Sequence, residues 1–179
     1  MFKATEDSRI QISELMKPSH ANFGGKIHGG YILSLMDNIA FACASKHSRS
    51  YCVTASVNKV NFLNPIEVGE LVTMKASVNY VGKSSMVVGI RVEAENIRTG
   101  ETKHCNSSYF IMVAVDEEGN TVTVPGLILT TKLAAKRFIK SIIRRDSDTK
   151  RSADLQSLYK NVDQHLEQLK DHRVKIDFK

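Results

Sequence analysis

The chain has 179 residues, of which 42% are apolar, and a formal net charge of +6. Its length suits one ordinary domain with an appendage, and its composition excludes an intrinsically disordered chain. No apolar run is long enough to cross a membrane, and the N-terminal stretch "MFKATEDSRIQ" carries acids and lacks the apolar core of a signal peptide.

A strand, a glycine-rich loop and a helix are predicted first. Residues 8–16 alternate well enough for a strand, and residues 17–29 form a loop with Pro18, Asn22 and several glycines. From about residue 30 to residue 45 the pattern is helical, with apolar side chains on nearly every side. Such a helix is expected to be wrapped by other structure.

After this helix the pattern changes to a period of two, which is typical of strands. The predicted strands cover residues 52–63, 70–81, 86–98 and 102–115, and the "TG" pair at 99–100 predicts a tight hairpin. One apolar helix and long antiparallel strands predict an α+β fold. The sheet must curl around the helix, because nothing else in the chain can cover so apolar an element.

Two further helices are predicted at residues 127–145 and 153–173, separated by "RRDSDTKRS". The basic charge belongs to this part of the chain. Residues 126–179 hold 13 Lys or Arg and 7 Asp or Glu, whereas residues 1–125 hold 12 of each. We therefore predict a domain at 8–125 and a basic helical extension at 126–179.

Asp37 is the one acid in the stretch "ANFGGKIHGGYILSLMDNIAFACAS". One interpretation is structural: a helix-surface aspartate on a polar edge with Ser34 and Asn38, or a buried acid bonded to a strand. The other is chemical, because an acid can activate water, the amide of Asn22 in the preceding loop can position it, and a helix N-terminus can stabilise developing charge. Together these form a hydrolytic set without a metal.

The glycines Gly29 and Gly30 open the helix and leave backbone N–H groups accessible, which suits an oxyanion. Asp37 follows about two turns later, roughly 10–12 Å along the helix axis at 1.5 Å per residue. That is too far to act on the same carbonyl group within one chain, unless the substrate follows the helix or a second chain contributes.

These residues carry a family resemblance. "NFGGKIHGGYILSLMD", "CVTASVNKVNFLNPIEVGE", "VGKSSM", "IRVEAENIRTGE" and "NSSYFIMVAV" together resemble hotdog-fold acyl-CoA thioesterases of the YciA-like type, over residues 8–145. The resemblance implies a hotdog fold, hydrolysis of acyl-CoA to a free acid and coenzyme A (CoA), and no cofactor beyond the CoA of the substrate. It also implies edge-to-edge dimers that assemble as a trimer of dimers.

The resemblance further assigns roles to residues. Asn22 of one subunit would face Asp37 of its partner, with Asp37 as general base or, alternatively, as nucleophile. The N–H groups near Gly29 and Gly30 would hold the carbonyl oxygen. The segment that matches "VGKSSM" lies near CoA in the family, so Gly82, Lys83, Ser84 and Ser85 are candidate CoA contacts.

Other candidates were weighed against this set. His28 beside the glycines is an alternative acid–base group, or it fixes the loop. Cys43 and Cys52 lack a readable histidine and acid companion, so buried thiols are the simpler interpretation. His104 and Cys105 are expected to pack within a strand, and no metal-ligand spacing is present. Three scattered cysteines favour reduced thiols and a cytoplasmic location.

The basic extension has two interpretations. In the first, its first helix packs on the outer sheet and keeps a solvated basic face. In the second, Arg144 and Arg145 contact the phosphates of CoA, because the guanidinium group binds phosphate oxygens well. Nucleic acid is not an expected partner, because the extension offers only Phe138 and Tyr159 for stacking. A non-catalytic acyl-CoA-binding regulator on the same fold is the alternative to the enzyme.

Overall fold

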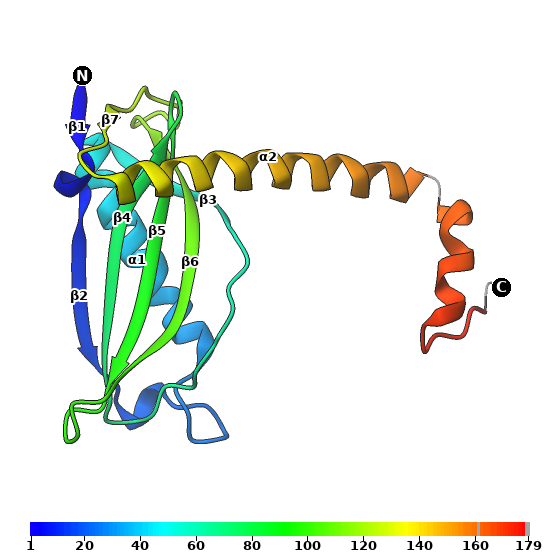
Figure 1. Ribbon diagram of the computed structural model, residues 1–179, viewed down its shortest axis with the longest axis horizontal. Coiled ribbons are helices and arrows are strands. Elements are labelled where there is room, and N and C mark those ends of the chain that lie inside the picture. The colour runs from blue at the N-terminus through cyan, green and yellow to red at the C-terminus, as the bar shows by residue number, and fades with distance from the viewer. Residues whose placement is uncertain (161, 178–179) are drawn as a thin grey trace. The chain divides into compact units, whose positions relative to one another are not determined.

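The structure is a computed structural model that describes residues 1–160 and 162–177. Its centre is a five-stranded antiparallel sheet in the order β2-β4-β5-β6-β3. These strands are β2 (Ile10–Leu15), β3 (Tyr51–Val57), β4 (Leu71–Val81), β5 (Ser85–Glu95) and β6 (Thr102–Val115). Helix α1 (Gly29–Ser48) lies against one face of the sheet (Figure 1).

The packing of α1 explains this arrangement. Ile32, Met36, Ile39 and Cys43 are fully buried and form one core cluster with alternate residues of the strands, among them Met74 of β4. The other side chains of each strand point to the opposite face, as the pleat requires. The predicted α+β fold, with an antiparallel sheet wrapped around a long central helix, is confirmed.

The third strand is shorter than predicted. We expected it at 52–63, but β3 ends at Val57, after a bulge between Thr54 and Ser56. The chain then leaves the ladder and bows outward between two backbone hydrogen bonds to β6, from Asn58 N to Tyr109 O and from Leu63 N to Cys105 O. We call residues 58–63 the strap. The strand-like pattern of residues 52–63 does not reveal the bulge, because a bulge changes strand pairing rather than composition.

Four short elements, within residues 2–20 and at residues 126–128, were not predicted. Strands β1 (Phe2–Ala4) and β7 (Gly126–Ile128) form a separate parallel pair, and η1 (Thr5–Ser8) and η2 (Pro18–His20) are single 3₁₀ turns. A three-residue strand is too short to carry a detectable period.

The C-terminal prediction was wrong in detail. Helix α2 (Lys132–Lys160) runs through the predicted break, and a 3₁₀ segment, η3 (Val162–Asp171), follows; residue 161 of the predicted second helix lies outside the described residues. "RRDSDTKRS" contains no Gly or Pro, and its hydroxyls bond within the helix, from Ser147 Oγ to Ile143 O and from Thr149 Oγ1 to Arg145 O. These bonds let polar residues continue the helix.

The chain divides into two compact units, Met1–Phe138 and Ile139–Lys179. The domain boundaries that the sequence suggests, at 8–125 and 126–179, stay a prediction. Within the described residues, no helix is long and apolar enough to span a bilayer.

His47 near the end of α1 is a buried titratable group. Its Nε2 lies 2.9 Å from the carbonyl oxygen of Pro125, which can only accept, so Nε2 carries the hydrogen. Burial lowers the pKa of His47 below its usual 6.5; the bond to Pro125 opposes this shift, nearby Lys3 adds to it and Asp7 opposes it. Folding therefore favours the neutral ring.

We predict that acid destabilises the protein through His47. A histidine whose pKa is lower in the folded state contributes stability above its unfolded pKa, and this contribution is lost as the pH falls below about 6.5. Thermal unfolding between pH 8 and pH 5 should show a steeper loss of Tm for the wild type than for His47→Gln. Parallel curves for the two proteins would contradict this assignment.

Candidate active site

Asp37 lies on the side of α1 that meets the edge strand β3. Its Oδ1 accepts a hydrogen bond from Thr54 Oγ1 at 2.6 Å, and the side chain is exposed in the single chain. Ser34 and Asn38 are exposed as well, so α1 has a polar edge. Of the structural interpretations, burial of the acid in the core is wrong. The carboxylate is held in one orientation at the border between α1 and β3.

Thr54 is a functional candidate that the sequence reasoning missed. It belongs to an alternating stretch, "CVTASV", in which no residue type marks it out. Its position opposite Asp37 depends on the register of β3 on β6, where Thr54 pairs with Met112, and on the bulge that follows. Only the tertiary arrangement brings the hydroxyl group to the carboxylate.

The loop before α1 holds the amide of Asn22 in a defined orientation. Asn22 Oδ1 accepts from the backbone N–H groups of Gly24 at 2.9 Å and Lys26 at 3.2 Å. Gly25 has φ +76°, a conformation that glycine adopts without strain. Because its oxygen is occupied, the exposed amide offers its NH₂ group as a donor. No hydrogen bond joins Asn22 to Asp37 among the residues described here.

His28 caps the N-terminus of α1. Its Nδ1 accepts from Gly30 N at 2.9 Å, so Nδ1 carries no hydrogen. The N–H of Gly30 is therefore occupied, whereas the N–H of Gly29 has no acceptor within the described part of the chain. Of the two N–H groups assigned to an oxyanion, Gly29 is the one that remains available.

The strap lies across this helix end. A Cβ atom at Gly29 would lie 3.2 Å from Cζ of Phe62, so the tip of the ring faces the Gly29 backbone. Phe62 is itself 51% exposed. Along α1, two contacts therefore stand about 12 Å apart: the Gly29–Phe62 contact at the N-terminus and the Asp37–Thr54 contact two turns later. The first contact joins α1 to the strap and the second joins it to β3.

The β4–β5 turn, with four of the predicted CoA contacts, closes one end of the sheet. Gly82 N donates to Ser85 O at 2.7 Å, while Lys83 O and Ser84 O accept from Val124 N and Ala114 N at 2.9 and 3.0 Å. These bonds fix the backbone, and the Lys83 side chain is exposed. Arg144 and Arg145 belong to the second unit, so their contact with CoA stays a prediction.

The alternative nucleophiles are buried. Burial raises the pKa of the Cys43 thiol to about 12, and its Sγ donates to Ser8 O, so it is protonated at neutral pH. Cys52 and Cys105 are buried free thiols, and Nε2 of His104 lies 2.9 Å from both Asn106 O and Ser107 Oγ. Over residues 1–160 and 162–177, no group of His, Cys, Asp and Glu could hold a metal ion.

Comparison with known proteins places the chain in a family. The model of the thioesterase superfamily matches residues 24–101. Protein VdlD of Helicobacter pylori is 40% identical over 143 residues, covering 80% of this chain and 82% of VdlD. The uncharacterized acyl-CoA thioester hydrolase YkhA of Bacillus subtilis is 34% identical, covering 71% and 74% of the two chains. The chain belongs to the thioesterase superfamily.

Solved structures of thioesterases share this fold. A hexameric acyl-CoA thioesterase superposes with a TM-score of 0.83 at 34% identity, covering 85% of this chain and 97% of that one. An acyl-CoA hydrolase of Staphylococcus aureus, solved with butyryl-CoA and CoA, superposes at 0.81 with 26% identity, covering 90% and 99%. Variants of that hydrolase replace an asparagine, an aspartate and a threonine by alanine, at positions separated by 15 and 17 residues. Asn22, Asp37 and Thr54 have the same spacing.

The contact of Phe62 with Gly29 predicts a measurable coupling. Gly29→Ala improves helix propensity by up to about 1 kcal/mol where space allows, but here the new methyl group meets the Phe62 ring. In urea unfolding, Gly29→Ala should therefore be more favourable in a Phe62→Ala background than in the wild type, by about 0.5 kcal/mol or more. Leu63→Ala, a change in the next residue of the strap, is the matched control and should show no coupling. Additive effects with Phe62→Ala would exclude the contact.

Proposed function

We propose that this protein is an acyl-CoA thioesterase, which converts acyl-CoA and water to a carboxylic acid and CoA. The observation that carries the proposal is the fixed Asp37 carboxylate beside Thr54. Its helix follows the Asn22 loop and begins at Gly29, whose N–H has no acceptor in the described part of the chain. Membership of the thioesterase superfamily and the shared 15- and 17-residue spacing support it.

In the proposed reaction, Asp37 removes a proton from water as the water oxygen attacks the thioester carbonyl carbon. Thr54 donates to Oδ1, which leaves Oδ2 to act as the base. The amide of Asn22 orients the water or the thioester, and the N–H of Gly29 stabilises the oxyanion. Collapse of the tetrahedral intermediate breaks the C–S bond, and the thiolate of CoA takes up the proton. Direct attack by Asp37, with an anhydride intermediate, is the alternative route.

A second subunit completes the proposed site. Among the described residues, strand β3 pairs only with β6, and its side chains Tyr51, Val53 and Val57 are 64%, 41% and 45% exposed. An open edge strand with exposed apolar side chains favours pairing with a copy of itself. We propose an edge-to-edge dimer in which Asn22 of one subunit faces Asp37 of its partner, and a trimer of dimers, as the hexameric neighbour suggests.

The proposal extends to the rest of CoA. Gly82, Lys83, Ser84 and Ser85 form the turn that we assign to CoA binding, and Arg144 and Arg145 are assigned to its phosphates. The proposed reaction uses no metal and no cofactor, because CoA belongs to the substrate. We propose the cytoplasm as its location, since all three cysteines are free thiols.

Replacement of Asp37 tests the chemistry. Asp37→Asn keeps the shape of the side chain and removes the base, so thiol release from a panel of acyl-CoAs should fall to background while the oligomer stays intact on size-exclusion chromatography. Unchanged steady-state hydrolysis by pure Asp37→Asn protein would overturn the mechanism. Binding of acyl-CoA by the wild type without thiol release would instead support the non-catalytic regulator.

Complementation tests whether the site is shared between subunits. Asn22→Ala alone should cost about 10²-fold or more in activity, since it removes the group that positions the water. When Asn22→Ala and Asp37→Asn chains are mixed after reversible unfolding, hybrid dimers contain one intact site. With random pairing, about a quarter of wild-type activity should return. If Asn22 and Asp37 act within one chain, mixing restores nothing, and each variant remixed with itself is the control.

A further inference from the structure

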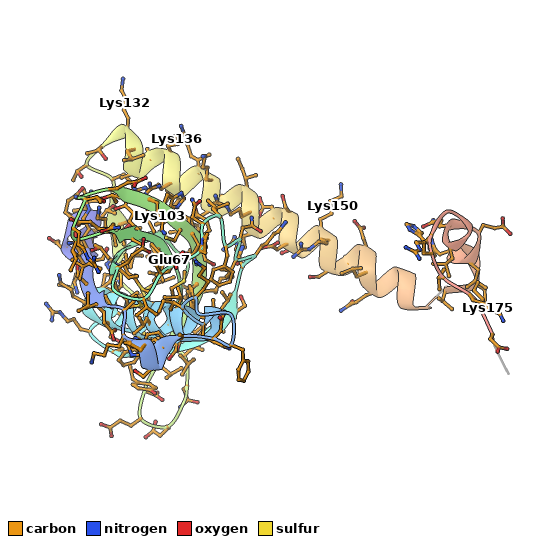
Figure 2. The ribbon with its side chains drawn as sticks, turned by 90° about the horizontal axis from the view of Figure 1, so that it is seen from below. Glu67, Lys103, Lys132, Lys136, Lys150 and Lys175 are labelled. Atoms are coloured by element: carbon orange, nitrogen blue, oxygen red, sulfur yellow. The ribbon has the colours of Figure 1, made fainter. Side chains whose placement is uncertain are left out.

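A second pocket lies on the face of the sheet that is turned away from α1. It has a volume of about 640 Å³ and is bordered by β2, β4, β5, β6 and the first turns of α2. In Figure 1, the first turns of α2, before Phe138, lie over the strands on the side away from α1. In Figure 2, Lys132 and Lys136 of these turns point outward, whereas Leu133 and Arg137 line the pocket. Gly29, Asp37 and Thr54 do not line it.

The lining of this pocket is basic. It includes Arg9, Lys75, Arg91 and Arg137 and no acidic residue. Beside it, Lys75 Nζ and Arg91 Nε both contact the carboxylate of Glu93, at 2.6 and 2.7 Å. The hydrogen bond from Lys75, followed by the one from Arg91, holds the pKa of the Glu93 carboxyl below its usual value. Two cations therefore share one carboxylate, which leaves positive charge at the mouth of the pocket.

The floor of the pocket presents an unused donor. Asn79 is only 5% exposed, and its Oδ1 accepts from Ser77 Oγ at 3.1 Å. Its Nδ2 has no acceptor among the described residues. A Cβ atom at Gly89 on the adjacent strand would lie 2.1 Å from Nδ2, so only glycine at that position leaves room for the amide. An acceptor on a ligand in the pocket could therefore bond to this donor.

Apolar side chains complete the lining. Leu133 and the ring of Tyr109 border the same space as the cations and the Asn79 amide, and Tyr109 pairs with Gly89 on this face of the sheet. Its volume lies in the range of pockets that bind small organic molecules. We propose that this pocket is a second ligand site, which binds an organic anion: a carboxylate or phosphate group on an apolar body. The anionic group contacts Lys75, Arg91 and the Asn79 amide, and the body packs against the apolar residues.

The site does not depend on the proposed thioesterase activity, although the free acids that such an enzyme releases belong to this chemical class. Octanoate and octyl phosphate represent the two sources of the anion. Octanamide removes the charge but keeps the apolar body, and inorganic phosphate keeps the charge without the body. Isothermal titration of the full chain with these four probes separates the contributions.

Removing the positive charges of Lys75 and Arg91 at the mouth of the pocket tests the proposed ligand site. Octanoate or octyl phosphate should bind the wild type, whereas octanamide and inorganic phosphate should each bind at least tenfold more weakly. The double variant Lys75→Gln/Arg91→Gln should weaken binding of the anions at least tenfold and leave thioester hydrolysis unchanged. Lys103→Gln is the matched control, because it also removes a cation from an ion pair, with Glu70 at 2.8 Å, outside the pocket. It should bind as the wild type does.

Several results would overturn the proposal. Equal binding of the anions by the wild type and the double variant would place them elsewhere, including at the candidate active site beside Asp37. Equal binding of octanamide and octanoate would remove the role of charge. Loss of the oligomer in the double variant, with no anion bound by the wild type, would show that a second copy covers this face. If the double variant does not fold, each single variant should still weaken binding severalfold, and unchanged binding in both would refute the site.

Discussion

Everything in the first unit depends on the burial of α1 against the inner face of the curled sheet. Ile32, Met36 and Ile39 are at most 1% exposed, and each such side chain contributes about 1.5–3 kcal/mol by leaving water. This packing leaves little freedom to rotate α1 about its axis. It therefore also fixes where the polar edge of the helix emerges, and Asp37 reaches Thr54 because the rest of the helix cannot turn.

Glycines set the second constraint, because they determine where the backbone can be approached. At Gly29 the missing side chain lets the Phe62 ring lie against the helix end, while the N–H has no acceptor among the residues that the structure describes. At Gly89, on the opposite face of the sheet, it makes room for the Asn79 amide. The two faces thus differ in kind: the inner face is mainly apolar and carries the helix, whereas the outer face combines a polar floor with a cationic border.

Much of this architecture could be predicted from the sequence, because long elements carry a clear period. β6 begins and ends where its alternation predicts, and α1 extends only a few residues beyond its predicted ends. Asn22 and Asp37 are recognisable as candidates in the sequence because each is unusual for its setting. Thr54 is not, since a threonine in a strand is ordinary, and its contact with Asp37 depends on a register and a bulge that involve residues more than fifty positions away. The occupied N–H of Gly30 escaped prediction for a similar reason, because it depends on a side-chain rotamer of His28.

The exposure of Asp37 follows from the fold rather than opposing a catalytic role. A base that must meet both water and a large thioester cannot lie inside the core that stabilises the helix, so it belongs at the border of α1 and the edge strand. That border is also where the sheet is incomplete, since β3 has an open side with exposed apolar residues. A partner that pairs with β3 would cover the same region and exclude water from it, which strengthens every polar contact there. In the proposed dimer, assembly and catalysis would therefore be coupled, because the strand edge available to a partner is the edge beside the Asp37 carboxylate.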